Sequence, residues 1–183
     1  KLARSNVLVH EMNCVETLAR VNVLCVDKTG TITRPDMSVS DVVFLKDNVG
    51  KLIAGVAGNM DDDNETMKAI KDYYHITDRD NSAERVYSFS SQNKYSGAVL
   101  DGRCYIFGAP EYVLLDTYAE YEDIFERYSG HGERILVFGE CVGDPCGNII
   151  EEAVNPYAFI ILENEIRDTA KETFGYFASQ GVD

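Results

Sequence analysis

A single carboxylate, hydroxyl side chains and a glycine stand together in the stretch CVDKTGTIT, residues 25–33. Its aspartate, Asp27, directly follows the apolar run 21–26 (VNVLCV), a pattern typical of a strand buried on both faces of a parallel sheet. At the carboxyl end of such a strand an aspartate can attack a phosphoryl group, with backbone N–H groups around the phosphate and Mg²⁺ offsetting the charge of both reactants. An aspartate can also simply end the strand and cap a turn, so the residues alone leave both interpretations of Asp27 open.

The stretch from Asp27 to Thr33, DKTGTIT, resembles the phosphorylation-site signature of P-type ATPases, the ion pumps that transfer the γ-phosphoryl group of ATP to this aspartate. The resemblance implies an ATP-driven cation pump in which Asp27 is the nucleophile and in which Asp27 and the Thr29 carbonyl help to bind Mg²⁺. The alternative is a phosphatase of the dehalogenase-like superfamily, to which the pumps also belong. Such phosphatases usually carry a second aspartate two positions after the nucleophile. Thr29 stands there and cannot act as an acid or base near neutral pH, which favours the pump.

The two ends of the chain predict one parallel sheet. The apolar run 157–162 (YAFIIL) has the same character as 21–26, and the apolar residues of 163–181 recur at helical spacing up to Gly181, which fits a helix C-cap. We therefore expect an α/β fold with a partial Rossmann-like, dehalogenase-like parallel sheet assembled from both chain ends.

Between the ends, from about residue 35 to 156, the pattern changes to short alternating segments and amphipathic helices. Turn residues separate these segments, and Asp101-Gly102 is a strong hairpin signal. This part predicts an inserted α+β domain built on an antiparallel sheet. Its strands are expected at 37–45, 85–91, 95–101, 103–108, 134–142 and near 148–154, and its helices at 48–59, 65–75 and 120–128.

The order of these parts matches the family, in which an ATP-binding insert divides the phosphorylation domain. We expect residues 1–34 to be the first part of the phosphorylation domain, 35–156 the nucleotide-binding domain and 157–183 a second, truncated part. The family's later T-G-D segment, second lysine and G-D-G-x-N-D loop do not follow, so we expect an excerpt of a longer pump that is inactive by itself. An ATP-binding module without activity is the other hypothesis that stays open.

The resemblance also implies where ATP is bound. In FSSQNKYSG, Phe89 takes the place of the aromatic residue that stacks on adenine, and Lys94 that of the lysine that lines the pocket. The segment FGAPEYV resembles a K-G-A-x-E motif whose glycine, here Gly108, lets the nucleotide approach the backbone. Two further implied positions are Arg134, which reaches toward the ribose and phosphates, and Thr66, which begins a Thr-Glu pair of the family.

Two departures from the family pattern concern this site. Phe107 replaces the lysine of the K-G-A-x-E motif, and Met67 replaces the glutamate that accepts a hydrogen bond from the adenine amino group. We therefore expect weak ATP binding, in the high micromolar to millimolar range, roughly −4 to −6 kcal/mol, and tighter binding after restoring Lys at 107 and Glu at 67. Asn164 and Arg167 stand at the Asp and Arg places of a segment that is often D-P-x-R in the family. The resemblance implies that Arg167 braces the hinge between the two domains; an ordinary arginine in the first turn of a helix is the alternative.

Composition limits the partners. The net charge of −14 disfavours nucleic acid and anionic lipid as ligands, and no apolar run approaches the roughly 20 residues of a membrane helix. Five cysteines without a C-x-x-C pair and three scattered histidines predict neither a zinc site nor a disulfide framework. We expect a soluble fragment that binds ATP and Mg²⁺ on the cytoplasmic face of a membrane. The membrane and actuator domains of the same pump are its expected partners, and the transported cation is bound elsewhere.

Overall fold

The computed structural model describes residues 13–18, 20–61, 64–78, 80, 82–129, 132–146 and 149–182. The chain divides into two compact units, one formed by Pro35–Glu165 and the other by the residues up to Arg34 and from Ile166 onward. We call them the insert unit and the flanking unit. Of the residues considered above, His10 and His131 lie outside the described part.

A six-stranded sheet organises the insert unit, with the strands in the order β1-β6-β5-β4-β3-β2. The pairings from β2 through to β6 are antiparallel, as predicted for the insert. Asp101 and Gly102 both have positive φ angles, 49° and 71°, and turn β3 into β4, so the predicted hairpin is confirmed. The strands are β1 (Thr33–Phe44), β2 (Arg85–Tyr87), β3 (Tyr95–Leu100), β4 (Arg103–Gly108), β5 (Arg134–Glu140) and β6 (Asn155–Ile166).

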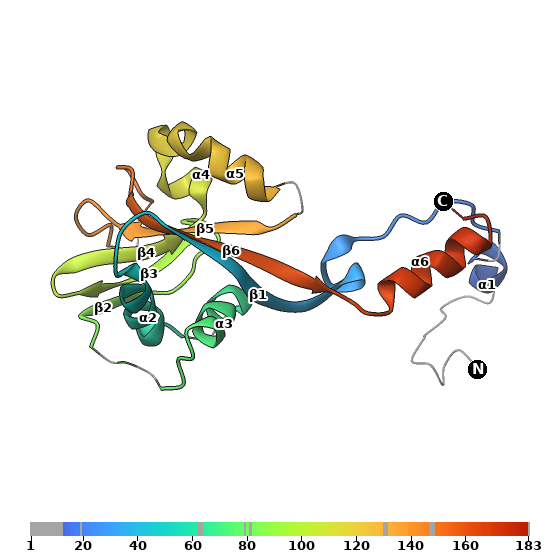
Figure 1. The fold of residues 1–183 in the computed structure, drawn as a ribbon, viewed down its shortest axis with the longest axis horizontal. Coiled ribbons are helices and arrows are strands. Elements are labelled where there is room, and N and C mark those ends of the chain that lie inside the picture. The colour runs from blue at the N-terminus through green and yellow to red at the C-terminus, as the bar shows by residue number, and fades with distance from the viewer. Residues whose placement is uncertain are drawn as a thin grey trace. The chain divides into compact units, whose positions relative to one another are not determined.

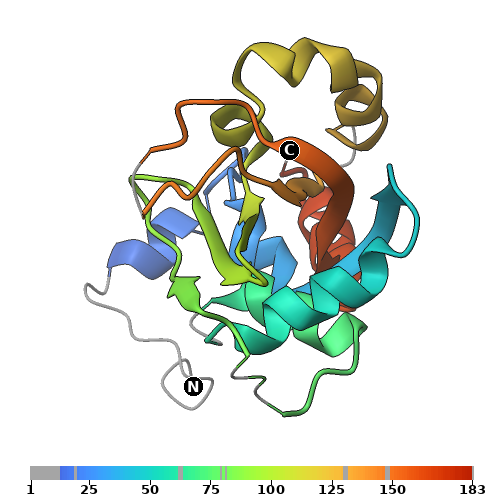
Figure 2. The same cartoon turned by 90° about the vertical axis from the view of Figure 1, so that its left-hand side faces the viewer.

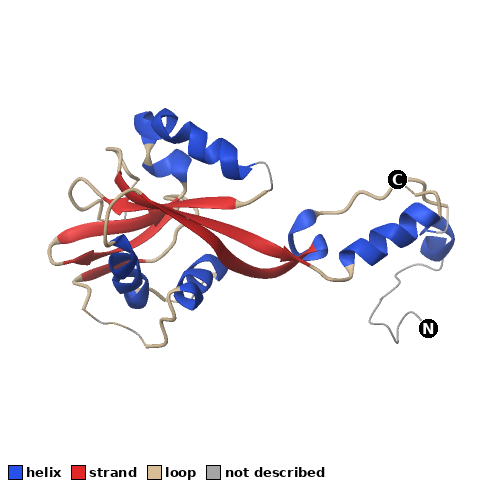
Figure 3. Ribbon diagram, viewed as in Figure 1, coloured by secondary structure: helices blue, strands red, loops and turns tan. Residues whose placement is uncertain are grey.

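Helices cover both faces of this sheet (Figures 1 and 2). The pair α2 (Val49–Asn59) and α3 (Glu65–Tyr73) lies on one face, and α4 (Pro110–Val113), the 3₁₀ helix η3 (Leu115–Tyr121) and α5 (Glu122–Ser129) lie on the other. Figure 3 shows the resulting layers, with strands between two sets of helices. None of the described helices is long and apolar enough to cross a membrane.

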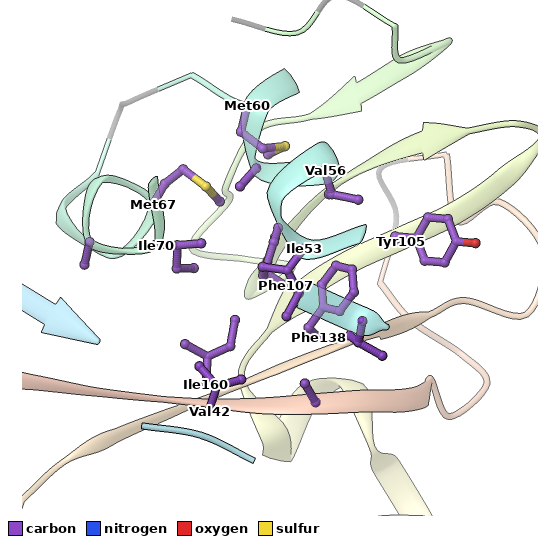
Figure 4. Close-up of a cluster of buried hydrophobic side chains, with 14 of the residues drawn as sticks. Val42, Ile53, Val56, Met60, Met67, Ile70, Tyr105, Phe107, Phe138 and Ile160 are labelled. Carbon is purple, nitrogen blue, oxygen red and sulfur yellow. The ribbon is translucent and has the colours of Figure 1, made fainter. Parts of the chain in front are cut away.

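Each face of the sheet has its own hydrophobic core. The first core joins α2 and α3 to the sheet through side chains that include Ile53, Ile70, Phe107 and Phe138 (Figure 4). The second core joins α4 and α5 to the opposite face, and Phe125 and Phe159 meet there edge to face. Two separate cores on one sheet give the insert unit its three layers.

β6 is buried on both of its faces although it pairs antiparallel with β5. Ala158, Ile160 and Leu162 point into the first core, whereas Phe159 and Ile161 point into the second. A continuous apolar run shows that both faces of a strand are covered, but it does not show the direction of the neighbouring strands. Residues 157–162 were expected in a parallel sheet of the phosphorylation domain; they lie instead in the antiparallel sheet of the insert unit.

Side-chain hydrogen bonds fix the helices of the first layer. Asn64 is the N-cap of α3, and its side-chain oxygen accepts a hydrogen bond from the Met67 N–H at 2.9 Å. Lys71 Nζ, on α3, donates to the Met60 carbonyl oxygen at the end of α2, at 2.7 Å. The two helices are thereby tied together, which holds the inner face of α3 against the sheet.

The flanking unit contains α1 (Asn13–Leu18), a single π-helical turn η2 (Lys28–Ile32) and α6 (Ala170–Ser179). Gly181, with φ +75°, follows α6 in the predicted C-cap place. The strand expected at 21–26 is wrong: these described residues form no strand, and Val23 and Val26 are 58% and 38% exposed. An apolar run becomes a buried strand only where other elements cover it, and none of the described residues of this unit does so. The strand expected near 148–154 is likewise absent from the described residues 149–154.

Glycine positions offer a test of this packing. A Cβ at Gly97, in the middle of β3, would lie 2.2 Å from the Tyr105 carbonyl oxygen, whereas a Cβ at Gly55, inside α2, would meet no atom within 4 Å. We expect Gly97→Ala to lower the free energy of unfolding by about 2 kcal/mol or more, and Gly55→Ala to raise it by about 0.5 kcal/mol or more. Urea unfolding followed by circular dichroism measures both. Equal effects of the two substitutions would contradict the β3–β4 packing.

Candidate functional site

Asp27 lies immediately before the π-helical turn and does not cap it. The backbone of Asp27 is extended, with φ −70° and ψ 142°, and its exposed side chain makes no capping hydrogen bond within the described structure. The interpretation of Asp27 as a residue that ends a strand and caps a turn therefore finds neither a strand before it nor a cap after it. The carboxylate is left open to solvent and to ligands.

The loop that follows Asp27 is held from within by Thr33. The buried Thr33 hydroxyl accepts a hydrogen bond from the Gly30 N–H and donates one to the Lys28 carbonyl oxygen, both at 3.3 Å. The Thr33 N–H also donates to the Lys28 carbonyl oxygen. Gly30 has a φ angle of +77°, a conformation that favours glycine. The last threonine of the signature and its glycine thus shape the loop locally.

Arg167 holds the same loop from a distant part of the sequence. Its Nη2 donates to the Gly30 carbonyl oxygen at 3.0 Å, and its Nε donates to the Thr33 carbonyl oxygen at 3.1 Å. Its backbone N–H donates to the Ile32 carbonyl oxygen at 2.9 Å. The resemblance placed Arg167 at a hinge, but these hydrogen bonds could not be predicted from the sequence. Every residue has a backbone carbonyl, so the residue types do not show which carbonyls accept a hydrogen bond from Arg167.

The residues around Asp27 fit a Mg²⁺ ion that is shared with a phosphate group. Mg²⁺ keeps several waters and usually takes one or two carboxylates together with substrate phosphates, rather than a complete protein cage. The exposed Asp27 carboxylate supplies one such ligand, and Thr29 lies within the turn that follows it. Among the described residues, no three His, Cys, Asp or Glu side chains form a metal cluster of their own.

The predicted adenine-binding residues Phe89 and Lys94 lie on the loop between β2 and β3. Phe89 is 48% exposed although it is a large apolar side chain. Lys94 has a φ angle of +58°, and its N–H donates to the Ser90 carbonyl oxygen at 2.8 Å, which closes the loop. Phe89 is therefore a ring presented to solvent by an ordered turn, whereas phenylalanine side chains are more often buried.

The structure brings this loop next to Gly108. The Ala109 N–H donates to the Lys94 carbonyl oxygen at 3.1 Å, so the residue after Gly108 is bonded directly to the predicted pocket lysine. The Lys94 ammonium lies 6.0 Å from the centroid of the Tyr112 ring. A Cβ at Gly108 would lie 2.3 Å from Val113 Cγ1, so the packing of α4 on β4 by itself requires glycine there.

An ion-paired network anchors the strand that leads to Phe89. Arg85 Nη1 donates to Asp144 at 2.5 Å, and the Tyr87 hydroxyl donates to the same carboxylate. Burial and this hydrogen bond raise the pKa of Tyr87 to about 12, whereas the hydrogen bond from Tyr87 lowers the pKa of Asp144. At neutral pH the network therefore holds a neutral phenol and a charged carboxylate, which fixes β2 to the loop at residues 141–146.

The two departures from the family pattern share one environment. Phe107 and Met67 are each 2% exposed, and both belong to the first core between α2, α3 and the sheet (Figure 4). A lysine at 107 or a glutamate at 67 would place a charge among these apolar side chains. The expectation that these two substitutions tighten ATP binding is therefore revised, because the structure offers neither charge a solvated position.

Thr66 and Arg134 have their described contacts with other strands of the sheet. The Thr66 hydroxyl lies 3.7 Å from Met37 Sδ, on β1. Arg134 is exposed at the first position of β5, opposite Leu162 of β6. The described contacts do not connect either residue to Lys94 or Gly108, and their predicted contacts with ATP stay predictions.

The same phenylalanine-to-lysine substitution at Phe107 and at Phe89 tests which of the two rings is buried. We expect Phe107→Lys to lower the free energy of unfolding by about 3 kcal/mol or more, because it removes a core ring and buries an ammonium group. Phe89→Lys, with the same chemical change on an exposed loop, should stay within about 0.5 kcal/mol of the parent. Denaturant midpoints compare the two, and a Phe107→Lys protein as stable as Phe89→Lys would show that position 107 opens to solvent.

Comparisons with known proteins relate the chain to cation pumps. The calcium-transporting ATPase CtpE of Mycolicibacterium smegmatis is 36% identical over 184 residues, which cover 100% of this chain and 23% of that protein. The probable cation-transporting ATPase exp7 of Streptococcus pneumoniae is 34% identical over 190 residues, again with 100% of this chain and 24% of that protein. The chain thus spans about a quarter of the length of these relatives. No protein-family model matches it.

Solved structures that share this fold include a catalytic domain and a larger pump structure. The catalytic domain of the CPx-ATPase CopB-B matches with a TM-score of 0.61 at 11% identity, over 96% of this chain and 57% of that one. A zinc-transporting PIB-type ATPase in the E2.Pi state matches with a TM-score of 0.63 at 17% identity, over 99% of this chain and 28% of that one. The predicted resemblance is thereby confirmed, and the chain is similar over its whole length to a segment of the P-type ATPases.

Proposed function

We propose that the protein containing this chain is an ATP-driven cation pump that passes through an aspartyl phosphate at Asp27. The observation that carries the proposal is the loop DKTGTIT, in which the carboxylate of Asp27 is exposed and uncapped while the residues after it are held by Thr33 and Arg167. The matched relatives are named calcium-transporting and cation-transporting ATPases, which supports this reaction class.

The chemistry expected of Asp27 is an in-line displacement. A carboxylate oxygen forms a bond to the γ-phosphorus as the bond to the β,γ-bridging oxygen breaks, and ADP leaves with that electron pair. Mg²⁺, when bound, offsets the negative charge of the phosphate and the carboxylate. The contribution of this chain is to keep the Asp27 carboxylate exposed, at the start of a loop whose shape is held by Thr33 and Arg167.

The insert unit is the proposed ATP-binding part, and the flanking unit carries the proposed phosphorylation site. Phe89 offers a face for stacking on adenine, worth about 1 to 3 kcal/mol per base, and Lys94 on the same loop offers a cation. The CopB-B catalytic domain, which shares this fold, is described as changing conformation on nucleotide binding, and this supports the assignment. Gly108, Arg134 and Thr66 are the further proposed contacts.

Weak nucleotide binding is part of the proposal. Phe107 and Met67 fill the first core and present no charge to a ligand, so that recognition of the base depends on Phe89 and Lys94. The net charge of −14 adds a general repulsion for a triphosphate. We propose that the membrane and actuator domains of the same pump complete the site, that the transported cation is bound among the membrane helices, and that this segment works on the cytoplasmic face.

The stacking role of Phe89 has a matched control in Phe44, which is 50% exposed on β1 and carries the same side chain. We expect Phe89→Ala to weaken ATP binding about fivefold or more, because the stacked face is lost, and Phe44→Ala to leave it within a factor of two. Amide shifts during an ATP titration give both constants. If both substitutions weaken ATP binding equally, or if ATP shifts no amide signals of the Phe89–Lys94 loop, adenine does not bind at this loop.

The nucleophile is tested in the protein that contains the whole chain. After incubation with Mg²⁺ and γ-labelled ATP and an acid quench, we expect hydroxylamine-sensitive label on the parent protein and none on the Asp27→Asn variant. Asp36→Asn, a nearby exposed aspartate on β1, is the control and should retain the label. Labelled Asp27→Asn protein would refute the assignment of Asp27.

A further inference from the structure

Arg167 is separated by 137 residues from Gly30, to which it is hydrogen-bonded, and it directly follows the last residue of β6. The guanidinium group spans two backbone carbonyls of the loop after Asp27, those of Gly30 at 3.0 Å and Thr33 at 3.1 Å. A planar fork of donors can bridge two acceptors in this way, whereas an ammonium group is a single point charge. All three residues belong to the flanking unit.

These bonds fix more than two carbonyl groups, because each peptide group is planar and trans. When the Gly30 carbonyl oxygen points toward Arg167, the N–H of Thr31 in the same peptide plane must point the opposite way. The Lys28 carbonyl oxygen is held by the hydroxyl and the N–H of Thr33, and this turns the N–H of Thr29 away from Thr33 in the same manner. Thr33 therefore orients the N–H of Thr29, and Arg167 orients the N–H of Thr31.

The turn passes through an exposed glycine. Gly30 lies at φ +77° and is exposed, and a Cβ built on it would meet no atom within 4 Å. Glycine lowers the cost of leaving any one backbone conformation, so that an exposed glycine turn needs outside support to stay in one state. Thr33 gives that support to the first half of the turn, and Arg167 gives it to the peptide between Gly30 and Thr31.

We propose that Arg167 is a positioning residue for phosphoryl transfer, which locks the Gly30–Thr31 peptide so that the Thr31 N–H faces the incoming phosphate. This inference rests on the proposed role of Asp27 as phosphoryl acceptor. Backbone N–H groups that are oriented before the reaction stabilise developing charge without a reorganisation cost. Loss of Arg167 then slows the transfer step and leaves ATP binding by the insert unit unchanged.

The test uses the protein that contains the whole chain, with Arg167→Ala, Arg167→Lys and a control. Arg20→Ala is the control, since Arg20 is also an exposed cation of the flanking unit, and its ion pair with Glu16 at 2.6 Å does not touch the loop. The rate of acid-stable phosphoenzyme formation in a single turnover is measured over a range of ATP concentrations. For Arg167→Ala we expect the rate at saturating ATP to fall by about tenfold or more. The ATP concentration at half-saturation should stay within a factor of two of that of the parent.

Arg167→Lys keeps the charge and can reach only one carbonyl at a time, so it should recover part of the rate. Hydrogen–deuterium exchange of residues 28–34 in the same proteins gives a second readout, which should be faster in Arg167→Ala and unchanged in Arg20→Ala. An unchanged rate, or a lower rate without faster exchange of this segment, would overturn the positioning role. If Arg167→Ala does not fold, the comparison of Arg167→Lys with Arg20→Ala decides by the same criteria.

Failure of this inference is distinct from failure of the proposed function. If Asp27→Asn still forms a phosphoenzyme, the acceptor assignment is wrong and Arg167 has no such role. If Asp27→Asn abolishes the phosphoenzyme and Arg167→Ala forms it at the parent rate, only the positioning role of Arg167 is wrong.

Discussion

Coverage of β6 on both faces is the constraint on which the insert unit depends. The strand lies between β1 and β5, and its successive side chains alternate between two cores that are covered by different helices. Apolar surface buried on a strand contributes about 25 cal/mol per Å², and losing either helical layer would expose half of the side chains of β6. The sheet is thereby fixed as the middle of three layers, and the loop that carries Phe89 and Lys94 lies at its rim, next to the end of β4 at Gly108.

The same packing accounts for the limited polarity of the proposed nucleotide site. Phe107 lies on β4 directly before Gly108, and it packs against Phe138 with ring centroids 4.9 Å apart. Met67 enters the same core from α3. Where the family pattern has charged groups, this chain has side chains that stabilise the first core. In the proposed function, recognition of a nucleotide therefore depends on the exposed ring of Phe89 and on Lys94.

The sequence predicted the insert better than its flanks, and the reason is physical. Helices such as Val49–Asn59 and hairpins such as that at Asp101-Gly102 are encoded by local periodicity and turn residues, so they appeared within a few residues of their predicted places. Runs such as 21–26 and 157–162 look alike in one dimension, but one is exposed and the other is buried on both faces. Whether an apolar run is buried depends on elements that are distant in the sequence. The hydrogen bonds from Arg167 to backbone carbonyls also could not be predicted from the pattern of side chains.

The central claim is that Asp27 accepts the phosphoryl group on a loop whose shape is held by Thr33 and Arg167. An experimental structure of the protein that contains the chain, with a non-hydrolysable ATP analogue and Mg²⁺, tests it most directly. We predict that the terminal phosphate lies at the Asp27 carboxylate, with the Gly30 carbonyl still bonded to Arg167. A terminal phosphate held by other residues while Asp27 stays uncoordinated would contradict the claim.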